Sequence, residues 1–435
     1  MRFISILLFA VIGVGALLYT IAADSARVRD YNAALAAARA DAEEGLPYPA
    51  VQDYTKALNI YNGDKAVILE YIEQTRLFDE GRWVKALRDF IERYPDDAWG
   101  YEQLGGYYLE KEGYARVLDV VRDARKAGAA SETLDGFYTA VKYRYRSIAG
   151  GFTGASRFAG GYALVRKGGV YGLIDIEGDE FIEPKYDAMS WPSNGIIAVT
   201  MNGESYYINA LEYKIKAPSR PVDALGLWAG ERALVEIDGK FGYTDRALQV
   251  PDTLEYEDAT TFSAGIAAVK KGGKWALIDT ALNPITEFIY DDIVKTDFGT
   301  CIAYGVVFAK QGGAYIMLDA AGNRIGNGSY EHVSPFASAD QPTGVIEGGK
   351  PRLIFHDGRT YENEALDLTG VTQVKGFSIG IAPAFDGLKW GYINHLGEFV
   401  IEPQFDECLP FESFGVAAVR TGSSWQYIRL LEYIA

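Results

Sequence analysis

The repeating pattern of this chain is clearest in residues 380–406, which read Gly380-Ile-Ala-Pro-Ala-Phe-Asp-Gly-Leu-Lys-Trp390-Gly-Tyr-Ile-Asn-His-Leu-Gly-Glu-Phe-Val-Ile-Glu-Pro403-Gln-Phe405-Asp406. A short apolar run is followed by a tight turn, a Trp-Gly strand, a second turn and a strand that ends in an aromatic residue and an acid. The same order recurs about eight times between residue 150 and the C-terminus. Self-similarity at this period is typical of repeat architectures, in which each unit buries its apolar face against its neighbours.

The spacing of the units is regular when each is aligned on the position of Gly391. The anchor residues are Gly172, Tyr206, Gly242, Ala276, Ile316, Arg352, Gly391 and Gln426, at spacings of 34, 36, 34, 40, 36, 39 and 35 residues. The residue before the anchor is aromatic in six units: Tyr171, Phe241, Trp275, Tyr315, Trp390 and Trp425. Because these aromatics recur in every part of the array, we expect them to form a structural core between neighbouring sheets rather than a ligand platform.

Each unit has the composition of a small antiparallel sheet. Residues 265–270 and 274–279 are short β-type runs, and the Gly-Gly pair between them is typical of a tight hairpin. A third run follows, for example residues 181–186. Pro184 in that run cannot donate to a strand ladder, which predicts an edge or an irregular outer strand.

Two of the units carry a recognisable signature. Residues 389–394 read Lys-Trp-Gly-Tyr-Ile-Asn and residues 274–279 read Lys-Trp-Ala-Leu-Ile-Asp. The segment from about residue 150 to residue 435 therefore resembles the WG-repeat family of bacterial β-repeat proteins. The resemblance implies an all-β array and implies no particular activity.

The two ends of the array suggest how it is arranged. The last unit stops after residues 425–429 and has no third run, so a strand from residues 142–154 could complete it and close a ring. A ring leaves few free strand edges, which favours a propeller-like array. An open β-solenoid is the alternative.

The N-terminus begins with an apolar stretch over residues 3–23 behind a single Arg2. About twenty apolar residues are enough to cross a bilayer as a helix. We therefore predict that residues 1–25 form a membrane anchor, with the bulk of the chain extracytoplasmic. A cleaved signal, giving a secreted protein, is the alternative.

Residues 26–146 have a helical pattern with a second repeat. The segment Tyr101-Glu-Gln-Leu104-Gly105-Gly-Tyr-Tyr108 is similar to the first helix of tetratricopeptide repeats, with Ala124 as the small residue of the second helix. We expect a tetratricopeptide-like α-solenoid; a generic helical spacer is the alternative. In that family the positions of Trp99, Glu102, Gly106 and Glu110 line the concave groove, which makes them candidates for contact with a peptide.

The composition argues against several kinds of function. A net charge of −17 opposes binding to a nucleic-acid backbone. The three histidines and two cysteines are too dispersed to predict a metal site, and no phosphate-binding loop or nucleophile elbow is present. We therefore expect no catalytic residues, no cofactor and no metal, because the acids recur once per unit as a structural feature would.

Together these patterns predict a membrane-tethered, non-catalytic interaction scaffold. The helical repeats would bind a peptide or protein partner and present the β array. The alternative is a protein that binds a carbohydrate or a cell-envelope polymer through aromatic residues of the β array.

Overall fold

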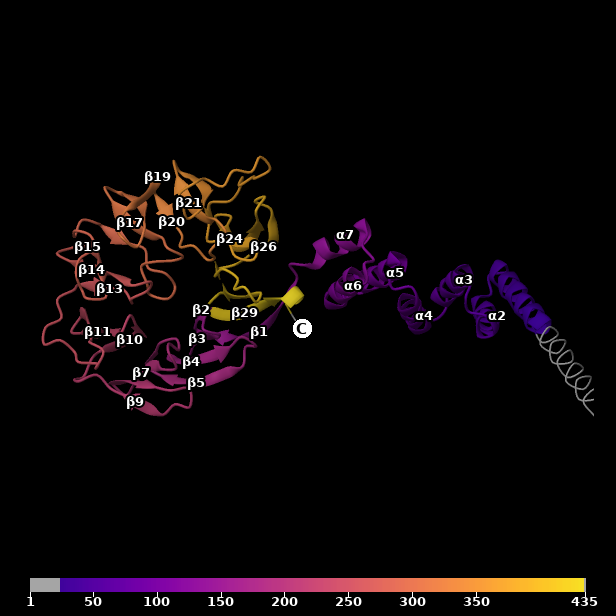
Figure 1. Ribbon diagram of the computed structural model, residues 1–435, viewed down its shortest axis with the longest axis horizontal. Coiled ribbons are helices and arrows are strands. Elements are labelled where there is room, and N and C mark those ends of the chain that lie inside the picture. The colour runs from indigo at the N-terminus through magenta and orange to yellow at the C-terminus, as the bar shows by residue number, and fades with distance from the viewer. Residues whose placement is uncertain (1–23, 434–435) are drawn as a thin grey trace, which may run out of the picture. The chain divides into compact units, whose positions relative to one another are not determined.

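The computed structural model describes residues 24–433 and divides the chain into two compact units, residues 1–142 and 143–435. The first unit is helical and the second is built of β-strands (Figure 1). The division lies close to the predicted boundaries at 146 and 150. It falls slightly earlier because the strand that starts at Tyr145 pairs within the β unit.

The described part of the helical unit is a series of helices. Residues 24–43 are helical. The helices that follow are α2 (Pro47–Ile60), α3 (Lys65–Arg76), α4 (Glu80–Arg93), α5 (Ala98–Glu110), α6 (Tyr114–Ala127) and α7 (Glu132–Val141). Each of α2 to α6 contacts the next helix along the chain.

Short polar side chains fix where these helices begin. The carboxylates of Asp64, Asp79 and Asp97 and the hydroxyl of Ser131 accept hydrogen bonds from backbone N–H groups in the first turns of α3, α4, α5 and α7. Such caps satisfy donors that have no partner inside the helix. Gly128 ends α6 with a φ of 81°, a conformation that glycine adopts without strain.

The motif that resembles a tetratricopeptide repeat lies at the packed face of α5. Tyr101, Leu104 and Tyr108 are buried, and a Cβ atom on Gly105 would lie 2.9 Å from the Phe137 ring of α7. Glycine at this position therefore permits the close approach of α5 and α7. This contact gives a physical reason for the small residue in the motif, whereas the family assignment of the helices stays a prediction.

The structure does not support a membrane anchor. None of the helices in the described range combines the length and the apolar character that a membrane crossing requires. Helices α2 to α7 have at most 14 residues, or about 21 Å at about 1.5 Å per residue, against about 30 Å of hydrocarbon. The helix over residues 24–43 is longer, but it carries Asp24, Arg27, Arg29 and Asp30 and so lacks the apolar character. The prediction of an N-terminal anchor is corrected accordingly, and the stretch 1–23 on which it rested lies outside the described residues.

The described strands of the second unit form eight sheets, which follow one another around a ring and make an eight-bladed β-propeller (Figure 1). Blades 1 to 4 are β2 (Gly154–Ala159), β3 (Tyr162–Lys167), β4 (Val170–Asp175) and β5 (Glu180–Tyr186); β6 (Ala188–Met189), β7 (Ile197–Met201), β8 (Glu204–Ile208) and β9 (Lys214–Lys216); β10 (Ala224–Ala229), β11 (Arg232–Ile237) and β12 (Lys240–Tyr243); and β13 (Asp258–Ala259), β14 (Ile266–Lys271) and β15 (Lys274–Asp279).

The remaining four blades continue in the same direction. They are β16 (Asp292–Ile293), β17 (Val307–Gln311), β18 (Ala314–Leu318) and β19 (Arg324–Tyr330); β20 (His332–Val333), β21 (Thr343–Glu347) and β22 (Lys350–Ile354); β23 (Gln373–Val374), β24 (Ile381–Phe385), β25 (Trp390–Asn394) and β26 (Phe399–Phe405); and β27 (Glu407–Cys408), β28 (Val416–Thr421) and β29 (Ser424–Leu430) with β1 (Tyr145–Phe152). A short 3-10 helix, Leu431–Tyr433, follows the last strand.

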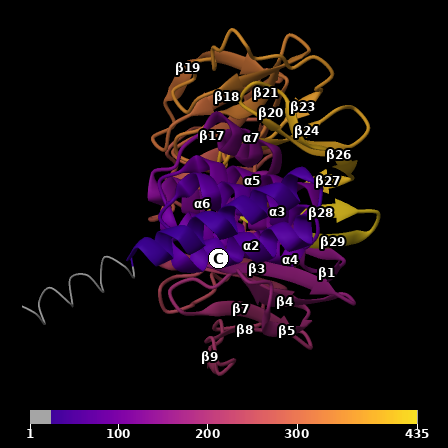
Figure 2. The ribbon, with the colours of Figure 1, turned by 90° about the vertical axis from the view of Figure 1, so that its right-hand side faces the viewer.

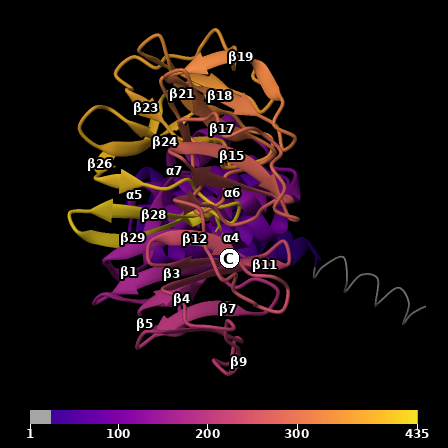
Figure 3. The same cartoon turned by 90° about the vertical axis from the view of Figure 1, so that its left-hand side faces the viewer.

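The ring is closed by pairing between the first and last strands of the unit. β1 runs antiparallel to β29, with Tyr145 opposite Leu430 and Phe152 opposite Trp425. Figures 2 and 3 show β1 beside β29 from two opposite sides. The predicted ring is therefore confirmed and the open solenoid is wrong. Closure protects the two strand edges that an open array would expose.

The glycine of the Trp-Gly pair is required where the third run of the unit crosses the second strand. A Cβ atom on Gly391 would lie 2.4 Å from the carbonyl oxygen of Ile401 and 2.8 Å from the nitrogen of Pro403. Gly172 meets the same arrangement, 2.5 Å from the Ile182 oxygen. In both blades the crossing run has the sequence Ile-Glu-Pro, so the Trp-Gly pair and the proline belong to one local structure.

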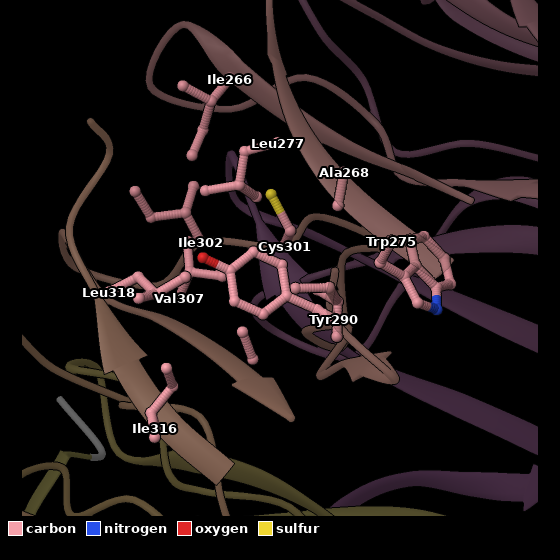
Figure 4. Close-up of a cluster of buried hydrophobic side chains, with 12 residues drawn as sticks. Ile266, Ala268, Trp275, Leu277, Tyr290, Cys301, Ile302, Val307, Ile316 and Leu318 are labelled. Carbon is pink, nitrogen blue, oxygen red and sulfur yellow. The ribbon is translucent and has the colours of Figure 1, made fainter. Parts of the chain in front are cut away.

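Apolar clusters between successive blades form the core. Between blades 4 and 5, Trp275 and Leu277 belong to the same buried cluster as Val307 and Leu318, with Tyr290 and Cys301 near its centre (Figure 4). The residue after the anchor adds a polar link to the next blade: the Tyr392 hydroxyl donates to the carbonyl of Leu409 at 2.8 Å. Tyr207, Tyr243 and Tyr427 make equivalent bonds at 2.7–2.9 Å. Successive blades thus bury apolar surface against one another, and four of them also donate this hydrogen bond to the next blade.

The recurring acids have a structural function. The carboxylate of Glu257 accepts hydrogen bonds from the backbone N–H groups of Gly272 and Gly273 at 2.8 and 3.0 Å. Glu331 binds the turn at Gly348 and Gly349 in the same way. The acid that ends one unit therefore holds the hairpin turn of the next blade, which explains its regular spacing.

Candidate binding sites

The aromatic residues of the repeat lie mostly between blades. Trp275 is 3% exposed and Trp390 is 9% exposed, while Tyr171, Phe241, Tyr315 and Trp425 are half-buried. The Lys375 ammonium lies 4.6 Å from the centre of the Trp390 ring and pairs with Glu407. The ring faces of the two buried tryptophans are occupied by protein atoms, which leaves little surface for a ligand.

The four residues proposed for peptide contact all lie on α5, but the structure gives them different surroundings. Trp99 is half-buried and packs edge-on against Phe90 at 5.2 Å. A Cβ atom on Gly106 would lie 3.6 Å from the Phe137 ring. Glu102 is half-buried and Glu110 is exposed. The two carboxylates are therefore the reachable members of this set.

A cavity of about 530 Å³ lies between α4, α5 and α6. It is lined by Tyr101, Leu104 and Tyr108 of α5, together with Arg88 and Arg116, among other residues. The four predicted residues are not among those that line it. Helix α5 therefore contributes two surfaces, the predicted one and this aromatic and charged cavity.

A second cavity, of about 360 Å³, lies at the centre of the propeller. Its walls include Arg157 of blade 1, Trp191 of blade 2 and Tyr304 of blade 5. Because blades 1 and 5 are opposite one another in a ring of eight, a cavity that both line is axial. We call it the axial cavity.

Arg157, which lines the axial cavity, belongs to a buried ion pair that joins the first and last blades of the ring. The Arg157 guanidinium, 8% exposed, donates to both carboxylate oxygens of Glu412 in blade 8, at 2.8 and 3.2 Å. Burial acts to lower the pKa of Arg157, but the Glu412 carboxylate outweighs it, so the pKa is raised. In a second ion pair between these two blades the arginine comes from blade 8, since Arg429 pairs with Glu177 of blade 1 at 2.7 Å. Two ion pairs thus cross the boundary between blades 8 and 1, which we call the seam and which the pairing of β1 with β29 closes.

An extended loop of blade 5 forms the opposite wall. The strands β13 and β14 of blade 4 are joined by residues 260–265, whereas β16 and β17 of blade 5 are joined by residues 294–306. The additional turn is held by hydrogen bonds between Thr296 and Thr300, and Thr261 donates to Gly299 at 2.8 Å. This turn places Asp297 and Phe298 in the cavity.

Aromatic side chains complete this wall. The Trp191 and Phe298 rings meet edge to face at 5.3 Å, and the Trp191 indole N–H donates to the carbonyl of Arg157 at 3.2 Å. Tyr304 is 52% exposed and donates its hydroxyl to the carbonyl of Ala337 at 3.0 Å. Its φ of 49° belongs to a turn that recurs in the ring, since Asn194, Ala264 and Ile379 have φ values of 52°, 50° and 48° at the same position of blades 2, 4 and 7.

The sequence contains an indirect sign of this cavity in the spacing of its repeats. The longest spacing between anchors, 40 residues, separates Ala276 from Ile316 and includes the extended loop. The partners of that loop come from blades distant in the sequence, so spacing alone could not identify them.

The two thiols and the acids suggest no chemistry of their own. Cys301 and Cys408 are buried in the apolar clusters, and burial raises the pKa of Cys301 to about 12. Within residues 24–433, no group of three or more His, Cys, Asp or Glu side chains is arranged to hold a metal ion.

The sheet topology defines an eight-bladed β-propeller, and comparison with known sequences identifies its repeat. The profile of the WG containing repeat matches residues 148–171, 171–204, 253–275 and 390–425. No curated protein matches the chain. A propeller that carries WG repeats suggests a non-catalytic module for protein interaction.

Similar solved structures include a eukaryotic initiation factor, with 10% identity, coverage of 67% of this chain and 88% of that one, and a TM-score of 0.42. BBS1N in complex with ARL6DN has 10% identity, coverage of 67% and 98%, and a TM-score of 0.31. The AfRom2 CNH domain has 8% identity, coverage of 66% and 99%, and a TM-score of 0.31. At these TM-scores the likenesses carry no argument, and the fold assignment rests on the sheet topology.

Proposed function

We propose that the protein is a non-catalytic scaffold whose helical unit binds a peptide or protein partner, while the propeller provides a second, rigid interaction surface. The main support is the combination of helices that pack in series along the chain with a surface cavity beside α5. Repeat stacks form extended surfaces that suit the binding of a polypeptide.

The predicted surface of α5 supplies the contacts in this proposal. Glu102 and Glu110 would bind basic groups of the partner, and Trp99 and Gly106 would shape the surface between them. Since Trp99 packs on Phe90, its contribution is to position this part of α5.

The test compares partners recovered with the full chain and with a Glu102→Gln, Glu110→Gln double variant. The control is a Glu44→Gln, Glu132→Gln variant, which makes the same charge change at exposed positions elsewhere in the helical unit. We expect the first variant to lose a partner that the control retains. Equal recovery by both variants would contradict the assignment of this surface.

The structure gives less support to carbohydrate binding through the repeated aromatics, because Trp275 and Trp390 are buried. A sugar would have to use the aromatic residues of the axial cavity. Binding of glycans by the wild-type chain and by a Trp191→Ala variant would measure that route directly.

A further inference from the structure

The axial cavity is the place where the propeller departs most from its own repeat. Two departures meet there: a buried arginine in blade 1 and the extended loop of blade 5. Structural constraints alone would recur through the ring, as the turn-binding acids and the aromatics before the anchors do in most units. Non-repeating residues that gather in one cavity indicate a function at that position.

The charges of the cavity leave a net negative balance, although Asp297 also contributes to raising the pKa of Arg157. Arg157 and Glu412 neutralise one another in a bidentate pair. Asp297 is exposed, and no ion pair or hydrogen bond of its carboxylate occurs among the described residues. Lys295, two residues before it, is already paired with Asp258 at 2.6 Å. The cavity therefore carries a formal charge of about −1 when its ion pair is counted as neutral.

The rings beside Asp297 fit a cationic ligand. Trp191, Phe298 and Tyr304 all line the cavity. The faces of aromatic rings attract alkylammonium and guanidinium groups, and a neighbouring carboxylate adds to this attraction. The chain already shows this contact once in the cavity, since the Arg157 guanidinium lies 5.8 Å from the centre of the Phe298 ring.

We propose that the axial cavity binds a cationic group, such as the alkylammonium head of a basic side chain or of a small quaternary amine, between Asp297 and the rings of Trp191, Phe298 and Tyr304. The site is separate from the surface of α5. It would give the propeller a recognition function of its own, which does not depend on a partner of the helical unit.

The experiment measures binding of choline to the full chain by isothermal titration, with 3,3-dimethyl-1-butanol as the uncharged analogue of the same shape and methyl glucoside as a neutral sugar. We expect choline to bind and the neutral analogue to bind at least about fivefold more weakly. Absence of choline binding, equal binding of the two analogues, or preference for the glucoside would overturn the proposal.

Matched variants place the binding in the cavity. Asp297→Asn should weaken choline binding at least about fivefold, whereas Glu183→Gln, which removes an exposed carboxylate in blade 1, should leave it unchanged. Phe298→Leu should also weaken binding, because it keeps an apolar side chain but removes the ring. Equal effects of Asp297→Asn and Glu183→Gln would show a general attraction to an acidic protein and would refute the site. Melting curves of all variants check that the fold is intact.

Discussion

Replacing Gly391 by alanine should destabilise the propeller by about 2–3 kcal/mol. The new Cβ atom would lie 2.4 Å from the carbonyl oxygen of Ile401, about 1 Å closer than an ordinary contact. The strand cannot move aside freely, because Trp390 and Tyr392, on either side of Gly391, are held in register with Phe405 and Ile401 of β26. A shift large enough to relieve the clash would weaken ladder hydrogen bonds worth about 1 kcal/mol each.

A matched control isolates this cause. At the equivalent position Gly242, the nearest atom to a new Cβ is a methyl carbon of Leu254 at 2.6 Å, the end of a flexible side chain that can rotate away. Gly242→Ala should therefore cost less than about 1 kcal/mol. Alanine occurs naturally at the same position in blade 4, as Ala276.

Both variants can be measured by urea unfolding of the full chain, with hydrogen exchange of peptides from β25 and β26 to localise the effect. The backbone clash predicts faster exchange in those two strands for Gly391→Ala. A change in unfolding free energy of less than about 0.5 kcal/mol for Gly391→Ala, or an equal cost for Gly242→Ala, would refute the reasoning.

Three further predictions concern the seam and the buried groups. Glu412→Ala should lower the unfolding free energy by about 3 kcal/mol in urea titrations, because it leaves the buried guanidinium of Arg157 unpaired; an unchanged midpoint would contradict this role. Cys301, whose pKa is about 12, should resist iodoacetamide at pH 8 in the native protein and react in urea, as read by mass spectrometry; rapid native labelling would disprove its burial. Burial raises the pKa of Tyr243 and Tyr392, so these hydroxyls lose their protons at lower pH in the unfolded chain than in the folded one. The two groups should leave the unfolding free energy unchanged below about pH 10 and should lower it at higher pH. Urea midpoints that rise with pH above this value would contradict the prediction.

Local patterns in the sequence predicted much of the β unit correctly. The glycine spacing and the Trp-Gly pairs, as at Gly391, predicted a ring of about eight similar sheets, and the missing third run of the last unit predicted closure by an N-terminal strand. These inferences succeeded because turns and strand alternation depend on residues a few positions apart.

Apolar composition was a poor guide at the N-terminus. Residues 1–23, which lie outside the described range, suggested an anchor, yet none of the helices that the structure describes is both long and apolar enough to cross a membrane. The peptide-contact residues on α5 show a similar limit. A family motif predicted their position on one helix, but the contact between Trp99 and Phe90 depends on how that helix packs.

The amino-acid sequence by itself determined the repeat, the hairpin turns within each unit and the regular spacing of the glycines, because these depend on backbone geometry over short distances. Only the tertiary structure decided which residues meet at the axis. Arg157 and Glu412 are 255 positions apart, and Asp297 reaches the same cavity from the opposite side of the ring. Whether these residues come close together depends on the total rotation about the axis through all eight blades, which no local sequence pattern specifies.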